Sequence, residues 1–218
     1  MQRNIQIFDS TLRDGAQAQG ISFSVEDKIK ILKSLDALGV GYIEAGNPGS
    51  NPKDLEFFER ARQVTLTHAK LAAFGSTRRR GIHVADDANV KSLLTADTPA
   101  IVIFGKSWDF HVTEIIRTTL KENLAMIRET LAFFKEKGKE VLYDAEHFFD
   151  GYKNNPDYAM QTLAAAVEGG ATCLVLCDTN GGCFPDETME IVRTVKAAHP
   201  EVDIGIHCHN DTGMAVAN

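Results

Sequence analysis

Towards its C-terminal end the sequence reads IGIHCHNDTG at residues 204–213, a short apolar run that ends in two histidines. β-Branched Ile204 and Ile206 favour an extended strand here. Side chains alternate between the two faces of a strand, so His207 and His209 are expected to project from the same face. Two imidazoles at this spacing can both reach one divalent cation.

A carboxylate that completes such a site is offered at the other end of the chain. Residues 11–17 read TLRDGAQ and follow a short β-rich run at residues 5–8. Asp14, His207 and His209 together form a two-histidine, one-carboxylate set, which leaves open positions for a chelating substrate. The alternative is that the two histidines are only hydrogen-bonded at a strand end.

The segments between these two stretches alternate between strand and helix patterns. Seven strands are predicted, at residues 5–8, 42–45, 71–74, 101–104, 141–146, 173–177 and 202–208. Helices are predicted at residues 25–38, 52–64, 88–96, 113–137, 157–168 and 186–199, the first with Ser24 and Asp27 as a capping box and Gly39 as its stop. Near-continuous apolar strands in this alternation indicate a parallel sheet covered on both faces.

Seven units at a spacing of roughly 30 residues favour an α/β fold of the (β/α)8 TIM-barrel type, truncated after about the seventh strand. Residues 1–218 are therefore expected to be the N-terminal portion of a catalytic barrel, with the eighth strand beyond residue 218. An open sheet of seven units is the structural alternative.

Nearly every predicted strand ends in a polar or ionisable residue, and the carboxyl ends of barrel strands carry the ligand site. Arg13 is suited to stabilising an oxyanion or clamping a carboxylate, or it pairs with Asp9 or Glu44. Glu146 is a candidate general base if burial raises its pKa, and pairing with a basic neighbour is the alternative. Residues 178–182 (DTNGG) offer the Thr179 hydroxyl and backbone N–H groups to a carboxylate, although a tight turn also explains the glycines.

The overall composition excludes several classes of protein. A net charge of −7 argues against a nucleic-acid surface. Arg78, Arg79 and Arg80 form the one basic run, which is either a solvated loop or a contact for a phosphorylated ligand. The four cysteines form no Cys-x-x-Cys pair, and neither a leader nor a membrane-spanning run is apparent. A reduced, cytoplasmic protein is expected.

These residues resemble a known family. The stretch LRDGAQ at residues 12–17, followed by Lys28, resembles the first signature of the isopropylmalate, homocitrate and citramalate synthases of the DRE-TIM metallolyase superfamily. Residues 204–217 resemble the second signature. The stretches DAEHFFDG at 144–151 and CDTNGG at 177–182 are most similar to the citramalate synthase type.

The resemblance implies an acyltransferase that joins acetyl-CoA to a 2-keto acid by a Claisen-type condensation. It implies Asp14, His207 and His209 as ligands of a divalent cation (zinc, manganese, magnesium or cobalt), with Arg13 polarising the keto oxygen. Glu146 would take part in deprotonating acetyl-CoA, and Gln17 and Thr179 would bind the keto acid. The resemblance also implies accessory domains beyond residue 218 and a homodimer of the full-length protein, so residues 1–218 alone are expected to turn over poorly.

Alternatives remain open at this point. A hydroxyacyl-CoA lyase shares both signatures, an amidohydrolase barrel also carries a His-x-His pair (there on its first strand), and a non-catalytic barrel would serve as an assembly module. Pyruvate is the favoured keto acid, with 2-ketoisovalerate next. A bulky residue at a strand end would favour pyruvate, and Leu71, Phe74 and Tyr143 are the candidates.

Overall fold

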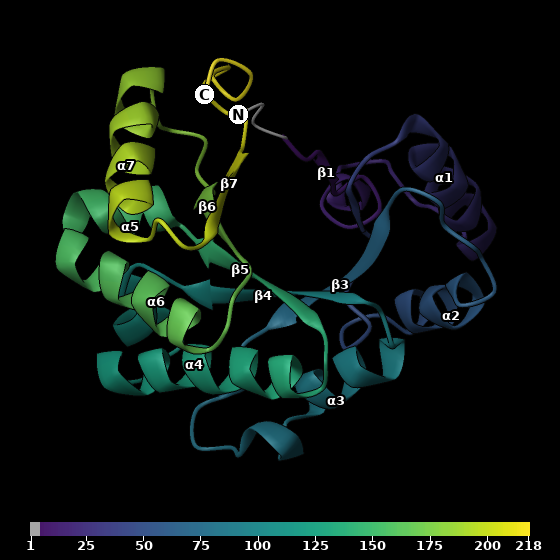
Figure 1. Cartoon of the computed structure of the whole chain (residues 1–218), viewed down its shortest axis with the longest axis horizontal. Coiled ribbons are helices and arrows are strands. Elements are labelled where there is room, and N and C mark those ends of the chain that lie inside the picture. Colours follow the sequence, from purple (N-terminus) through teal and green to yellow (C-terminus); the bar gives the residue numbers. More distant parts are fainter. Residues whose placement is uncertain (1–4) are drawn as a thin grey trace. The chain divides into compact units, whose positions relative to one another are not determined.

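The computed structural model describes residues 5–218, which form an α/β fold (Figure 1). Its strands are ordered β1-β2-β3-β4-β5-β6-β7 in one sheet, so neighbours in sequence are neighbours in the sheet. The described residues divide into two compact units, one of residues 5–76 and 85–102 and one of residues 77–84 and 103–218. Along the chain, the boundary between the units falls within β4 (Ala100–Lys106), after Val102.

The first unit contains β1 (Phe8–Asp9), α1 (Val25–Leu38), β2 (Tyr42–Glu44), α2 (Pro52–Ala61), β3 (Lys70–Ser76) and α3 (Ala88–Ala96). β2 pairs in parallel with both β1 and β3. Helix α1 begins at the predicted capping box, in which the Ser24 hydroxyl accepts from the Asp27 N–H, and ends at Gly39 with φ 87°. Its bounds are those predicted from the sequence.

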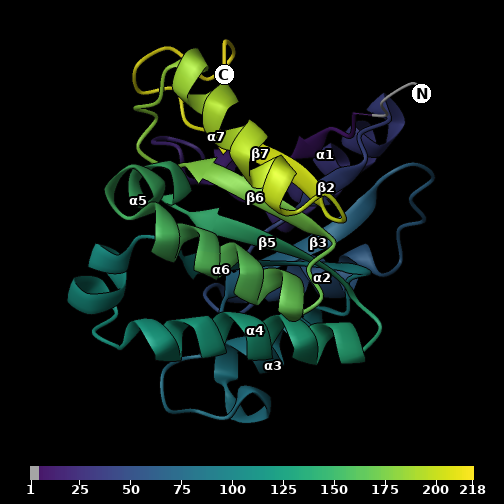
Figure 2. The same ribbon diagram turned by 60° about the vertical axis from the view of Figure 1, so that its left-hand side comes forward.

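The second unit contains α4 (Leu120–Glu136), β5 (Glu140–Glu146), α5 (Phe148–Asn154), α6 (Pro156–Glu168), β6 (Cys173–Asp178), α7 (Pro185–Ala198) and β7 (Asp203–Cys208). β6 pairs in parallel with β5 and β7. Helices α4 and α6 lie side by side, as Figure 2 shows after rotation. None of the described helices is both long and apolar enough to cross a bilayer.

Strand side chains alternate between a helix-facing set and an opposite set. Tyr143 belongs to the helix-facing set, because it is fully buried and lies, with Ile127 of α4, against the same side of Gly105. A Cβ on Gly105 would come within 2.9 Å of the Tyr143 ring, so glycine is required there. Asp144, next along β5, therefore points the opposite way, and Tyr143 is not a strand-end residue that limits the size of a substrate.

The predicted helix over residues 113–137 is wrong at its beginning. A π-helical turn at His111–Ile115 comes first, and α4 starts only at Leu120. Arg117 interrupts the helix with φ 52°, and the Thr119 hydroxyl accepts from the Glu122 N–H as the N-cap of α4. The apolar spacing continues across this break, which is why periodicity alone missed it. Helix α5 was also missed.

The basic run at residues 78–80 is not simply a solvated loop. Arg78 is only 5% exposed, and its guanidinium donates to Glu122 and Glu129 at 2.7 Å each. Both carboxylates lie on α4, so Arg78 ties the loop after β3 to that helix. Arg78 is therefore engaged in an internal ion-pair network.

Candidate active site

The TLRDGAQ segment forms a compact turn directly after β1. The Asp9 carboxylate accepts from the Thr11 N–H at 2.9 Å and from its hydroxyl at 3.1 Å. The Ser10 carbonyl accepts from the N–H groups of Arg13 and Gly15 at 3.0 and 3.1 Å. These bonds fix the backbone of the turn.

Arg13 lies in a layer of polar and aromatic contacts within the first unit. Its Nε donates to Glu44 Oε2 at 2.5 Å, and its Nη1 lies 3.4 Å from Asp14 Oδ1. The guanidinium carbon sits 3.9 Å from the centroid of the Phe74 ring, a cation–π contact. Of the alternatives for Arg13, the ion pair with Glu44 is present, and it orients the guanidinium.

Glu44 is fully buried at the end of β2. Burial raises the pKa of its carboxyl to about 7, against the opposing effect of the Arg13 guanidinium. Glu44 Oε1 accepts no hydrogen bond from the described residues. The sequence named Glu44 only as one possible partner of Arg13, because nothing in the sequence signals complete burial.

A cavity of about 250 Å³ opens beside Arg13 in the first unit. Its lining includes Gln17, Asn47, Lys53 and Phe74. Phe74 is thus the one of the three predicted bulky residues that lines this cavity. Lys28 also lines the cavity, but its ammonium is hydrogen-bonded to other residues of the first unit.

Lys28 has a structural role that its place in the first signature did not reveal. The ammonium donates to the Ala45 carbonyl and to Asp54 Oδ1, each at 2.6 Å. Only 3% of Lys28 is exposed. The buried pair holds α1 against the end of β2 and the start of α2.

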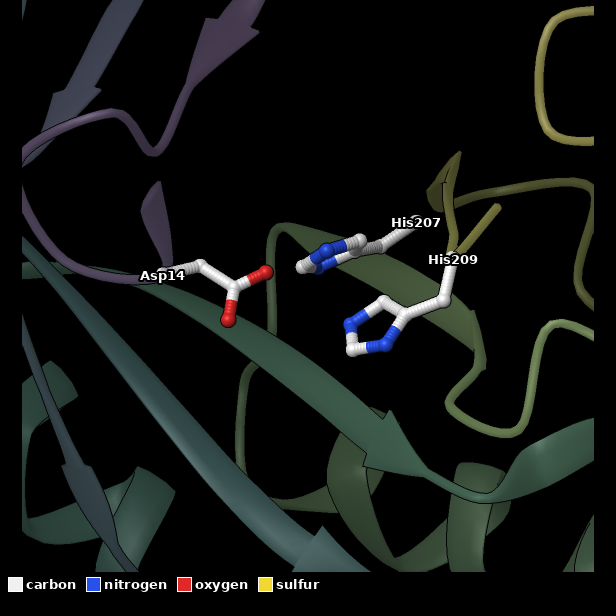
Figure 3. Close-up of side chains that lie close together, drawn as sticks. All are labelled: Asp14, His207 and His209. Atoms are coloured by element: carbon white, nitrogen blue, oxygen red, sulfur yellow. The ribbon is translucent and has the colours of Figure 1, made fainter. Parts of the chain in front are cut away.

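In the second unit, the His207 and His209 rings lie at the end of β7 with centroids 5.2 Å apart. Figure 3 shows both imidazoles projecting from this strand end, and it also labels Asp14, whose carboxylate extends from the turn after β1. The His209 N–H donates to the Asp178 carbonyl at 3.1 Å, which continues the pairing with β6 past Cys208. The predicted common face of the two histidines is therefore present.

Glu146 and Thr179 lie at the ends of β5 and β6. Glu146 forms an ion pair with Lys106 at the end of β4, as the pairing alternative predicted. Thr179 Oγ1 accepts from the His147 N–H at 2.9 Å, which leaves its hydroxyl hydrogen to donate. The partners of Lys106 and His147 depend on how neighbouring strands pair, which no local sequence pattern predicts.

In the glycine-containing turn after β6, the backbone N–H groups donate hydrogen bonds to Asp178 at the end of the strand. Those of Gly182 and Cys183 donate to the Asp178 carboxylate at 3.2 and 3.0 Å, and that of Gly181 donates to the Asp178 carbonyl. The tight-turn alternative therefore accounts for these three donors.

His111 and His147 pack together beside this rim, with ring centroids 4.6 Å apart. Burial first, and then the neighbouring His147, lowers the pKa of His111. The His147 Nδ1 lies 3.0 Å from Asp150 Oδ2, which also accepts from the Asn180 amide. This network holds the loop after β5 against the loop after β6.

The donor chemistry of the predicted ligands fits a divalent cation. Two imidazoles on one strand end and a carboxylate form a mixed set that zinc, manganese, cobalt and related cations accept. His207 and His209 are both half-buried.

A family model described as HMGL-like matches residues 4–218, and the chain belongs to this family. Among curated relatives, the (R)-citramalate synthase of Aquifex aeolicus is 55% identical over all 218 residues. The 2-isopropylmalate synthase of Sediminispirochaeta smaragdinae is 34% identical, again over the whole chain. The chain spans 41% and 43% of these two relatives.

The fold is shared with HMG-CoA lyases. The crystal structure of the lyase from Bacillus subtilis superimposes with a TM-score of 0.79 over 98% of this chain and 71% of its own, at 20% identity. The predicted fold class, an α/β TIM-barrel type with seven strands in this chain, is confirmed by the strand order and this likeness. The predicted family is confirmed as well.

Proposed function

We propose that the protein containing this chain is a metal-dependent acyltransferase that condenses acetyl-CoA with a 2-keto acid. Pyruvate is the proposed keto acid and citramalate the product, which places the reaction in branched-chain amino-acid biosynthesis. The observation that carries the proposal is the 55% identity to an (R)-citramalate synthase across the whole chain, against 34% to a 2-isopropylmalate synthase.

The proposed metal ligands are Asp14, His207 and His209. A divalent cation there would supply a Lewis acid for the keto group and for the alkoxide that develops from it. The common face of the two histidines on β7 supports the proposal. Zinc, manganese, magnesium and cobalt all remain compatible with the donors.

Arg13, Gln17 and Thr179 are proposed to bind the keto acid. The Arg13 guanidinium, oriented by Glu44, would donate to the keto oxygen, while the Thr179 hydroxyl would donate to the carboxylate. Gln17 lines the same cavity as Arg13, within reach of a ligand held there. The Phe74 ring on that cavity is suited to a small keto-acid side chain such as the pyruvate methyl group.

Glu146 is proposed as the carboxylate that takes part in removing a methyl proton from acetyl-CoA. The resulting enolate carbon forms the new bond to the keto carbon, and water then cleaves the thioester to release free CoA. Lys106 pairs with Glu146 and would hold this carboxylate in place at the end of β5.

The remaining domain organisation is also proposed. The chain covers about two fifths of its curated relatives, which supports a longer parent protein that supplies the eighth strand and accessory domains. We propose a cytoplasmic homodimer for that parent, with residues 1–218 alone turning over poorly.

The test uses the full-length parent. Release of free CoA thiol from acetyl-CoA is followed with pyruvate, 2-ketoisovalerate and 2-ketoglutarate, each with and without a divalent cation. Cation-dependent release that is fastest with pyruvate is the expected result. Release that is fastest with 2-ketoisovalerate would correct the keto acid, and no release with any keto acid would overturn the acyltransferase.

A further inference from the structure

Three neighbouring strands of the second unit bring chemically similar groups to the face opposite Tyr143. Cys177 on β6 is directly paired with His207 on β7, and Asp144 on β5 is paired with Val175 on β6. Paired residues of parallel strands point to the same face, and Val175 and Cys177 are two residues apart. Asp144, Cys177 and His207 therefore share one face.

The three side chains also lie close together. One potential ligand atom from each, a carboxylate oxygen, a thiol sulfur and an imidazole nitrogen, lies within 4.8 Å of the other two. Asp144 and Cys177 are each only 7% exposed. Interior positions of barrel strands are usually filled by bulky aliphatic residues. His207 is already a proposed ligand of the catalytic cation, so the two buried groups that call for a further explanation are Asp144 and Cys177.

We propose that Asp144, Cys177 and His207 form a second cation site, selective for thiophilic divalent cations such as zinc and cadmium. Zinc takes thiolate, imidazole and carboxylate ligands at about 2.0–2.3 Å, in sites of three protein ligands plus one open position. Rotation of the Asp144 and Cys177 side chains would bring the ligand atoms to these distances, and the Cys177 thiol would give up its contact with the Val175 carbonyl at 3.7 Å. Binding displaces the thiol proton of Cys177 to solvent.

This site shares His207 with the proposed catalytic one and differs from it in the other two ligands. Asp144 and Cys177 belong to β5 and β6, whereas His209 belongs to the end of β7. Hard cations such as magnesium avoid thiolate ligands, so only a soft cation would choose Cys177. Occupation by a soft cation would engage His207 and so compete with the proposed catalytic cation.

The experiment adds cadmium to metal-free full-length protein and follows the ultraviolet thiolate-to-cadmium charge-transfer band. We expect the band in the wild type and in His209→Ala, its loss in Cys177→Ser, and at least tenfold weaker binding in Asp144→Asn. Cys208→Ser is the matched control: Cys208 adjoins His207 on β7, but its side chain points to the other face. That variant should keep the band.

Loss of the band in Cys208→Ser instead of Cys177→Ser would overturn the proposal. So would loss in His209→Ala, because the thiol would then depend on the His207–His209 site. Cadmium-113 NMR of the wild type gives a readout that needs no variant: a resonance in the range of sulfur ligation is expected, and one in the range of nitrogen and oxygen ligation alone contradicts the site. These readouts are independent of catalysis, so failure of the acyltransferase proposal leaves them interpretable.

Discussion

The backbone N–H of His147 donates to Thr179 Oγ1 at 2.9 Å, which links the residue after β5 to the residue after β6. His147 adopts a left-handed conformation with φ 54°, and this conformation aims its N–H at Thr179. With its oxygen accepting, the Thr179 hydroxyl is directed to donate elsewhere. His147 is thus a positioning residue for Thr179.

His147→Val should disturb this arrangement, because a β-branched residue disfavours the left-handed region by about 1–2 kcal/mol. We expect the KM for the keto acid to rise about tenfold in the full-length enzyme, with a smaller change in kcat. His147→Asn is the matched control, since asparagine tolerates this conformation. Equal KM values for the two variants would show that the left-handed backbone at residue 147 does not contribute to binding of the keto acid.

Arg13→Lys should lower turnover while metal remains bound. A lysine ammonium cannot bond Glu44 and a substrate oxygen with the planar fork of a guanidinium, nor stack as well on Phe74. Loss of one such donor costs kcat roughly 10²–10³-fold. Steady-state rates and metal content of the same preparation test this, and a wild-type rate would exclude Arg13 from the mechanism.

The sequence predicted those features that depend on local signals. Ser24, Asp27 and Gly39 gave both ends of α1, and the alternation on β7 placed His207 and His209 on one face. Features that depend on the register of strands far apart in the sequence could not be predicted from it. The meeting of Asp144 with Cys177 depends on how β5 pairs with β6, which no local pattern encodes.

The hydrophobic periodicity of the sequence also failed to predict a helix boundary that depends on backbone conformation. The break before α4 lies at Arg117, whose positive φ no residue type announces. Similarly, no local pattern reveals that Glu44 is completely buried at the end of β2. The Arg13 guanidinium pairs with this buried carboxylate, as one of the alternatives for Arg13 predicted.

His207→Ala and Asp14→Asn should each reduce metal retention. If these residues are ligands, each variant should weaken affinity by more than about tenfold, since even residues that only support a ligand contribute that much. Metal analysis after dialysis of the full-length protein measures this. His199→Ala is the control, because His199 pairs with Glu201 after α7 and is assigned no ligand role. Full metal retention in both site variants would contradict the ligand assignment.

Glu44 should make stability fall as the pH rises towards neutrality. Burial raises its pKa to about 7, so the folded state binds this proton more tightly than the unfolded state does. The contribution is fully present below the unfolded pKa near 4.5 and is lost as the pH rises through 7. One proton gives a slope of at most about 1.4 kcal/mol per pH unit. Urea unfolding of wild type and Glu44→Gln across this range should show that the variant lacks this slope.

Asp36 on α1 anchors the segment that leads into β3. Its carboxylate accepts from the N–H groups of Thr67, His68 and Ala69 at 2.8–3.1 Å. Hydrogen bonds from the Ala69 and Thr67 amides lower the pKa of Asp36, so its stabilisation is present above pH 3.8 and is lost as the pH falls through the folded-state value. Asp36→Asn should destabilise the protein by about 2 kcal/mol at neutral pH, because charged acceptors form the stronger bonds.

Asp86→Asn is the control: Asp86 is exposed and lies 3.8 Å from Lys91, so its replacement should change the unfolding free energy by less than about 0.5 kcal/mol. Equal effects of the two substitutions in urea unfolding at pH 7 would show that the three backbone bonds contribute no net stability.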